Sequence, residues 1–103
     1  MTTSLTLTAG RDADGKVLLT VAGEIDQANA GILATGLEEA SGPVVVDLTD
    51  VEYLDSAGLS VLFAHSGHLE LIATDLLTPV LRVSGLAELV PVRGAPASGA
   101  PPR

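Results

Sequence analysis

Cysteine is absent from this chain of 103 residues, which excludes disulfide bridges and thiolate metal sites and suits a reducing compartment. Aromatic residues make up only 2% of the chain and hydrophobic residues 47%, so a folded core has to be aliphatic. No apolar run approaches the roughly 18 residues of a membrane-spanning helix, and the N-terminus lacks the pattern of a secretory signal. We therefore expect a soluble, unprocessed, cytoplasmic protein that does not insert into a membrane.

Basic residues are also scarce, because five Lys and Arg stand against 13 Asp and Glu, for a net charge of −8. The basic residues are scattered along the chain and form no stripe with stacking aromatics, which argues against direct nucleic-acid binding. The acidity itself allows two interpretations: solubility alone, or attraction to a partner with a basic face.

The hydrophobic pattern predicts the order strand, strand, helix, strand, helix, strand, helix. The strands are expected at 4–8, 16–22, 44–48 and 68–73. The helices are expected over 27–40, from Ser56 to about 66–67, and from 74–75 to 84–85. Because helices separate the later strands, we predict a single small α/β domain. Its mixed sheet should begin with an antiparallel hairpin and continue with parallel strands, with helices packed against it.

Several boundaries follow from local chemistry. Asp26 is a candidate cap for the helix over 27–40, and Ser41-Gly42-Pro43 should end that helix. The polar residues of 49–55 suggest that the backbone turns there. Pro79 either kinks the third helix or lies in its first turn, and 86–92 should close the fold as a short turn or strand. We assign the domain to 1–92 and a disordered Pro/Gly/Ala-rich tail to 93–103.

Asp55 and Ser56 come where the predicted turn becomes a helix. One interpretation makes Ser56 the N-cap, since its oxygen can accept an early helix N–H. The other makes Ser56 a phosphorylation site, where a phosphate would meet the positive end of the helix. That phosphate would add about 1.5 to 2 negative charges beside Asp55. Local chemistry leaves both open, and the two are compatible.

Catalytic and metal-binding patterns receive little support. There is no glycine-rich nucleotide motif, and Asp-Ser-Ala-Gly lacks the first glycine of a nucleophile elbow. Gly67 separates His65 from His68, which are the only imidazoles and lie at the far end of the helix from Ser56. We interpret the acids Asp26, Asp47, Asp50 and Asp55 as caps and turn residues rather than ligands of a divalent ion. We therefore predict no catalytic residue, no metal site and no cofactor.

Three segments, in this order and spacing, carry a resemblance to a known family. They are Gly23-Glu24-Ile25-Asp26, then Val46-Asp47-Leu48 followed by Val51 and Leu54-Asp55-Ser56-Ala57-Gly58-Leu59, and finally Val83-Ser84-Gly85-Leu86. From Ser4 to Val92 the chain resembles the STAS domain proteins, and within them the bacterial anti-sigma factor antagonists.

The resemblance implies a protein without enzymatic activity that binds an anti-sigma factor, commonly a serine kinase, and so frees a sigma factor for transcription. The kinase would phosphorylate Ser56 and release the antagonist, and a serine phosphatase would reset it. The partner-binding residues that the resemblance implies are Asp26, Asp55, Ser56, Ala57, Gly58 and Leu59.

Two departures from the family and two alternative functions go with this resemblance. Ala57 stands where the family usually has a second serine, and the helix after Ser56 is shorter than usual by about two turns. One alternative is a STAS-like subunit of a bacterial lipid-transport ABC system, where Asp-Ser/Thr-x-Gly-Leu sequences also occur. The other is an unphosphorylated STAS scaffold that only binds proteins, which the shortened helix favours.

Overall fold

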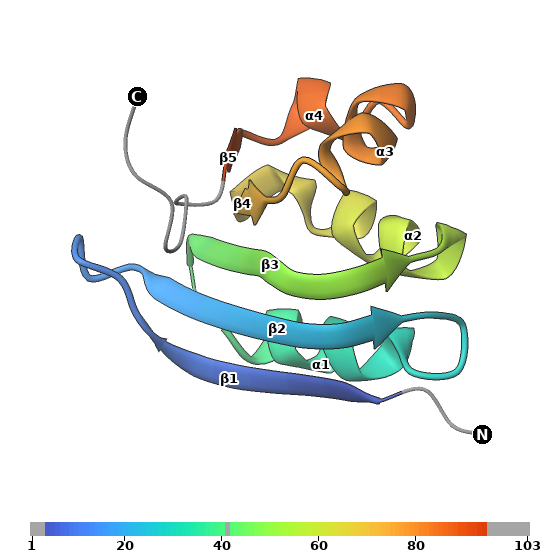
Figure 1. Cartoon of the computed structure of the whole chain (residues 1–103). Coiled ribbons are helices and arrows are strands. Elements are labelled where there is room, and N and C mark those ends of the chain that lie inside the picture. Colours follow the sequence, from blue (N-terminus) through green and yellow to red (C-terminus); the bar gives the residue numbers. More distant parts are fainter. Residues whose placement is uncertain (1–3, 41, 95–103) are drawn as a thin grey trace, which may run out of the picture.

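A mixed sheet of five strands runs through the molecule, in the order β1-β2-β3-β4-β5 (Figure 1). The computed structural model describes residues 4–40 and 42–94. The strands are β1 Leu5–Arg11, β2 Val17–Ile25, β3 Val44–Leu54, β4 Leu69–Ala73 and β5 Val92–Gly94. The helices are α1 Ala30–Glu39, α2 Ser56–Ala64, α3 Thr78–Val83 and α4 Leu86–Leu89, with a short 3₁₀ turn η1 Ser66–His68. The predicted α/β class is confirmed, with an antiparallel hairpin followed by parallel strands, and the structure adds β5 to the four predicted strands.

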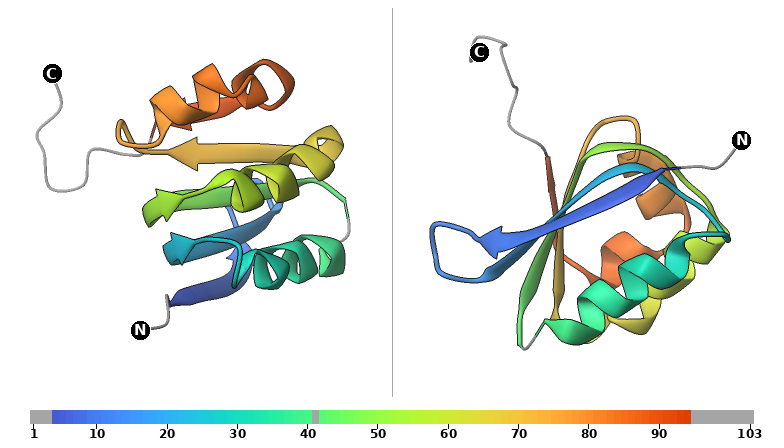
Figure 2. Two further views of the ribbon diagram at one scale, coloured as in Figure 1. Left: turned by 90° about the vertical axis from the view of Figure 1, so that its right-hand side faces the viewer. Right: turned by 90° about the horizontal axis from the view of Figure 1, so that it is seen from below.

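The helices lie on one face of the sheet, as both views in Figure 2 show. Only β1 and β2 are antiparallel, and every later pair of neighbouring strands is parallel. Each parallel connection must cross over through a helical segment, and such crossovers are almost always right-handed. Because the chain steps through the sheet in one direction from β2 to β5, right-handed crossovers place all the helices on the same side.

The structure extends β3 well beyond the predicted 44–48, as far as Leu54. The predicted turn over 49–55 is therefore wrong. The register between β2 and β3 shifts twice, between Thr20 and Ala22 and again between Gly23 and Glu24. These irregularities space the buried residues of β3 by three, at Leu48, Val51 and Leu54, instead of by two. The second half of β3 therefore lacks the two-residue alternation by which a strand is recognised in a sequence.

Helix α1 begins at Ala30, three residues later than predicted. Residues 27–29 form a polar turn instead, because the Asp26 side chain accepts the N–H of Ala28 at 2.9 Å. Asp26 therefore stabilises the turn before the helix and does not cap the helix itself. Ser41, part of the predicted helix stop, lies outside the described residues.

The C-terminal part resolves the two possibilities for Pro79. Helix α3 begins at Thr78 and holds Pro79 in its first turn, where a missing N–H costs no intrahelical bond. The segment predicted to close the fold divides into helix α4 and strand β5. Arg93 and Gly94, predicted to belong to the tail, instead pair with Ile72 and Ala73. The remainder of the predicted tail, 95–103, lies outside the described residues.

The core between sheet and helices is aliphatic, as the composition requires. Its fully buried large side chains include Val21, Ile25, Leu33, Leu37, Val44, Val46, Leu48, Leu62, Leu71, Leu81 and Leu86. Tyr53 is instead exposed, at 52%. In the part of the chain that the structure describes, no helix is long and apolar enough to cross a membrane.

Gly23 supplies a matched test of the fold. Its φ is +108°, and a Cβ at this position would overlap the backbone carbonyl oxygen of Ser4. Gly15 in the hairpin turn also has positive φ, at +82°, but open space around it. We expect Gly15→Ala to lower the free energy of unfolding by about 1 kcal/mol, through backbone strain alone. Gly23→Ala should cost at least about 2 kcal/mol more, because β1 must also move. Urea unfolding of both variants checks this, and equal losses would contradict the close approach of β1.

Candidate functional site

Strands β2 and β3 end side by side (Figure 1). This brings together two segments that carry the family resemblance, 23–26 and 54–59. Ile25, the last residue of β2, is paired in register with Leu54, the last residue of β3. The Asp55 N–H continues this pairing by donating to the Ile25 carbonyl oxygen at 3.1 Å. Asp26 and Asp55 therefore leave neighbouring strands at the same level, at the carboxyl edge of the parallel strands.

Asp55 is the N-cap of α2, and it also connects the two loops. Its Oδ1 accepts the N–H of Ala57 at 2.8 Å and that of Gly58 at 3.2 Å. Its Oδ2 accepts the N–H of Gln27 at 3.2 Å, from the loop that follows β2. A carboxylate suits this place because the helix N-terminus carries a partial positive charge. Of the two interpretations of Ser56, the N-cap is wrong, since Asp55 performs that role.

Ser56 is the first residue of α2 and its side chain is exposed. Because Asp55 accepts the helix N–H groups, the Ser56 hydroxyl is not needed to cap α2. No group within residues 4–40 and 42–94 forms a hydrogen bond with that hydroxyl. The Ser56 carbonyl oxygen accepts the hydroxyl of Ser60, one turn along the helix, at 2.9 Å. Ser56 therefore lies at the surface on a fixed backbone, with the capping bonds of Asp55 before it and the bond from Ser60 to its own carbonyl oxygen after it.

Asn29 is a residue of this site that the sequence analysis missed. It is 6% exposed, and its Nδ2 donates to the Glu24 carbonyl oxygen at 2.8 Å. Its Oδ1 accepts the N–H of Asp26 at 2.9 Å. Asn29 thus fixes the loop that carries Asp26 and Gln27. The sequence signal was an asparagine three residues after an aspartate, which is typical of a polar turn as well as of a helix start.

The next three predicted residues of the site turn toward the sheet. Ala57 and Leu59 are partly buried and pack against the core. Gly58 is buried, and a Cβ on it would lie 2.7 Å from Ile25 Cγ2 and 2.5 Å from Leu54 Cδ1. Glycine at this position lets the first turn of α2 approach the paired ends of β2 and β3.

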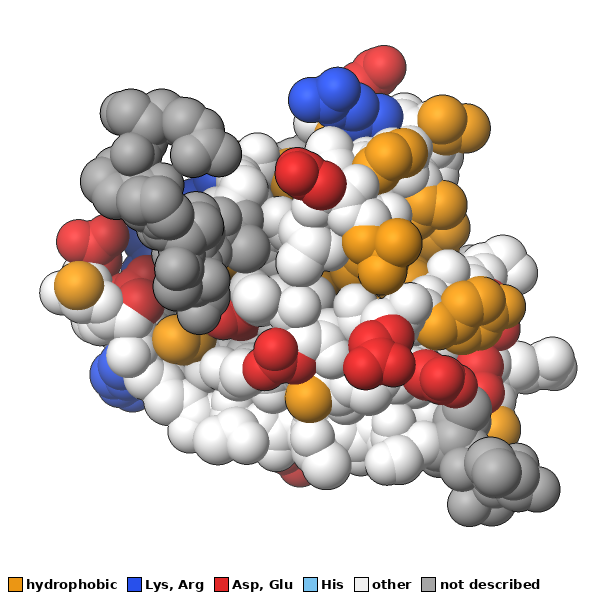
Figure 3. All heavy atoms as spheres, in the orientation of Figure 1, with side chains coloured by type: hydrophobic (Ala, Val, Ile, Leu, Met, Phe, Trp, Pro, Cys, Tyr) orange, Lys and Arg blue, Asp and Glu red, His pale blue; other side chains and the backbone are white. Residues whose placement is uncertain are grey.

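Exposed acidic and hydrophobic side chains lie near this edge of the molecule. Figure 3 shows a row of acidic side chains across the middle of one face and hydrophobic side chains gathered above it, toward α3. Exposed hydrophobic residues include Tyr53, beside the end of β3, and Leu76, Val80 and Val83 in and before α3. Asp50 and Glu52 of β3 are also exposed.

The histidines and Asp47 make local contacts, and Asp47 and Asp50 lie within β3 and not in a cap or turn as interpreted from the sequence. His65 Nδ1 lies 2.9 Å from the Val61 carbonyl oxygen, and its ring meets that of His68 edge-on at 5.9 Å. Both follow the C-terminal end of α2, whereas Ser56 begins it. Asp47 accepts the N–H of Thr49 at 2.9 Å. Within the described ranges, no group of three His, Asp or Glu side chains is placed to hold a metal ion.

Comparison with known proteins agrees with the family resemblance that the sequence segments carry. A family model described as "Mlab, STAS domain" matches residues 9–91. The chain therefore belongs to the STAS domain family.

Among curated proteins, the anti-sigma-F factor antagonist RsfB of Mycobacterium tuberculosis is 42% identical over 71 residues. The match covers 61% of this chain and 54% of RsfB, so this chain spans about half the length of that relative. Among solved structures, an anti-sigma factor antagonist from Mycobacterium paratuberculosis superposes with a TM-score of 0.77 at 28% identity, covering 87% of this chain and 86% of the other. SpoIIAA in its unphosphorylated form superposes with a TM-score of 0.66 at 14% identity over 90% of each chain, a likeness of fold.

Gly58 and Gly31 offer matched helix substitutions. Gly31→Ala, in open space on α1, should stabilise the fold by up to about 1 kcal/mol through helix propensity. Gly58→Ala should instead destabilise it by about 1–2 kcal/mol, because the methyl group displaces Ile25 and Leu54. Thermal unfolding distinguishes the two, and stabilisation by both variants would rule out the tight approach of α2.

Asp55 can be tested by comparing two replacements. Asp55→Ala removes the acceptor of three N–H groups and should lower the free energy of unfolding by about 1–2 kcal/mol. Asp55→Asn keeps a capping oxygen and should lose less than half of that amount. Denaturant unfolding gives both values, and equal losses would show that the charge of Asp55, and not its capping bonds, stabilises this loop.

Proposed function

We propose that this chain is an anti-sigma factor antagonist that is regulated by phosphorylation at Ser56. In its unphosphorylated form it binds an anti-sigma factor that is a serine kinase, and so frees a sigma factor in the cytoplasm. The kinase phosphorylates Ser56 and thereby releases the antagonist, and a serine phosphatase restores binding. The protein acts by binding and not by catalysis. The names of the relatives support the class of function, and the site supports the choice of residue.

The observation that carries the proposal is the division of roles between Asp55 and Ser56. A kinase needs a hydroxyl that reaches solvent on a segment whose backbone can be recognised. Ser56 is exposed, and its hydroxyl forms no hydrogen bond with any described group. Asp55 holds the preceding turn through the N–H groups of Gln27 and Ala57. Asp26, on the adjacent loop, and the partly buried edges of Ala57 and Leu59 border the surface that a partner would contact.

The geometry also supports a specific effect of the phosphate. Asp55 already accepts the N–H groups of Ala57 and Gly58, so a phosphate on Ser56 would stay at the surface instead of taking over the cap. It would add about 1.5 to 2 negative charges beside a carboxylate. The fold is therefore retained, and the change falls on the surface seen by the partner, through repulsion and bulk. Gly58, being buried, contributes by placing the helix.

The experiment is incubation of the protein with ATP, Mg²⁺ and candidate anti-sigma kinases of the same genome, followed by intact mass and peptide mapping. We expect one phosphate, at Ser56, and kinase affinity at least tenfold lower after phosphorylation, because like charges face each other. Ser56→Ala should remove the phosphate while changing the free energy of unfolding by no more than about 0.5 kcal/mol. The matched control is Ser60→Ala, which removes an exposed serine one turn along α2. This variant should still be phosphorylated at Ser56.

The other outcomes separate the alternatives. Tight, ATP-independent binding to one partner without any phosphate would contradict the regulatory part of the proposal and favour an unphosphorylated STAS scaffold. Copurification with an ABC ATPase and no binding to any anti-sigma kinase would favour the lipid-transport subunit. A phosphate that persists in Ser56→Ala would assign the modification to another residue.

A further inference from the structure

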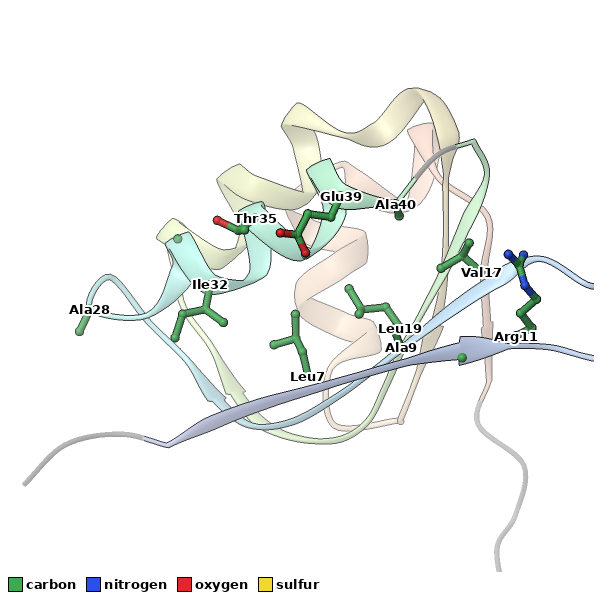
Figure 4. A pocket seen from close by; sticks show the side chains of 13 residues that line it. Leu7, Ala9, Arg11, Val17, Leu19, Ala28, Ile32, Thr35, Glu39 and Ala40 are labelled. Atoms are coloured by element: carbon green, nitrogen blue, oxygen red, sulfur yellow. The ribbon is translucent and has the colours of Figure 1, made fainter.

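An open groove separates the edge strand β1 from helix α1 (Figure 4). It encloses about 1200 Å³ and is lined mainly by apolar and small side chains. Leu7 points into it from β1 and Ile32 from α1, and Ile32 is 52% exposed. Among the described residues of its lining, only Arg11 and Glu39 are charged, one of each sign. A groove of this kind exposes apolar surface that a partner could bury.

The outer edge of β1 is open as well. Within the described residues β1 pairs with β2 alone, and its seven residues keep an unbroken register from Leu5 to Arg11. Proteins commonly protect such edges with proline, lysine, an inward charge or a bulge. In β1 none of these interrupts the strand, and the one charged residue, Arg11, lies at its end. The backbone of β1 is therefore free to pair with another strand.

The position of α1 indicates what would fit beside it. A Cβ on Gly36 would lie 2.7 Å from Leu7 Cδ2 and 3.5 Å from Leu19 Cδ2, so α1 lies above the β1–β2 pair. Strands in a sheet are about 4.8 Å apart. Pairing two β1 strands would therefore set two α1 helices roughly 10 Å apart, which is the distance of packed helices. A second copy of the chain thus has the dimensions needed to close the groove.

The sequence of β1 is compatible with pairing to itself. In antiparallel pairing centred on Thr8, Leu7 faces Ala9 of the second copy, a large side chain against a small one, and Thr8 faces its own equivalent. Charge favours this edge for self-association. The chain has a net charge of −8, yet β1 contributes no acidic residue, and Glu39 is the one acidic residue among the described residues that line the groove. Two strongly acidic molecules therefore meet here with little local repulsion.

We propose that two copies associate through β1, in antiparallel pairing that continues the sheet from one molecule into the next. The grooves of the two copies then merge across the twofold axis. Ile32 and Leu7 of both copies line the buried contact, together with Gly31 and Thr35 of α1 and Ala28 of the turn before it. Such a contact is isologous and closes as a dimer. It does not depend on the proposed function.

The test is sedimentation velocity of the whole protein over a concentration series that extends into the high micromolar range. We expect a dimer whose dissociation constant rises by roughly tenfold or more in Thr8→Lys, because two like charges then face each other across the strand pair. Ile32→Lys should weaken the dimer by a similar factor. The matched control is Val83→Lys, which makes the same charge change at a side chain 89% exposed on α3 and should leave the dimer intact.

Thermal unfolding of each variant, recorded under monomeric conditions, shows whether the fold is retained, which we expect because all three positions are exposed. A wild-type protein that stays monomeric at every concentration would overturn the proposal and leave the groove to a different molecule. A dimer that survives both Thr8→Lys and Ile32→Lys would overturn it too. Loss of the dimer in Val83→Lys would contradict the β1 interface and place the dimer contact on the exposed hydrophobic surface of α3.

Discussion

The pairing of Ile25 with Leu54 is the interaction on which the site depends. Both side chains are buried, both end their strands, and both meet the first turn of α2 through Gly58. Asp55 then links the two strand ends to one helix by accepting N–H groups from both loops. A change in the register of β2 against β3 would separate Asp26 from Asp55 and remove Ser56 from its place. The surface chemistry of the site is thus determined by backbone pairing and by packing beneath it.

Much of the fold could be predicted from hydrophobic periodicity. Helix α2, strand β4 and the hairpin repeat apolar residues regularly enough to be recognised. For Pro79 the sequence left a kink and a first helical turn open, and the structure shows the first turn. The second half of β3 was missed because its irregular register replaces the two-residue repeat with Leu48, Val51 and Leu54. The start of α1 was missed because a polar turn and a helix start use the same residue types.

The site shows the same limit at the scale of single residues. Asp and Ser are about equally favoured as N-caps, so the sequence alone does not decide between Asp55 and Ser56. The decision depends on where β3 ends, and the structure places that end at Leu54. Asn29 could not be recognised as a buried loop residue without knowing that the Glu24 carbonyl oxygen lies within its reach. The groove beside β1 likewise arises from the placement of α1, which no local pattern encodes.

The unequal lengths of β3 and β4 have a consequence for motion. Strand β4 pairs with β3 only from Val44 to Asp47, so within residues 4–40 and 42–94 the remainder of β3, as far as Leu54, pairs with β2 alone. Local opening of a protein begins where few neighbours hold the backbone hydrogen bonds. Amide hydrogens of this two-stranded extension should therefore exchange with solvent sooner than those at the start of β3. Ser56 follows directly from that extension, so the residue proposed for modification lies beside the least supported part of the central strand.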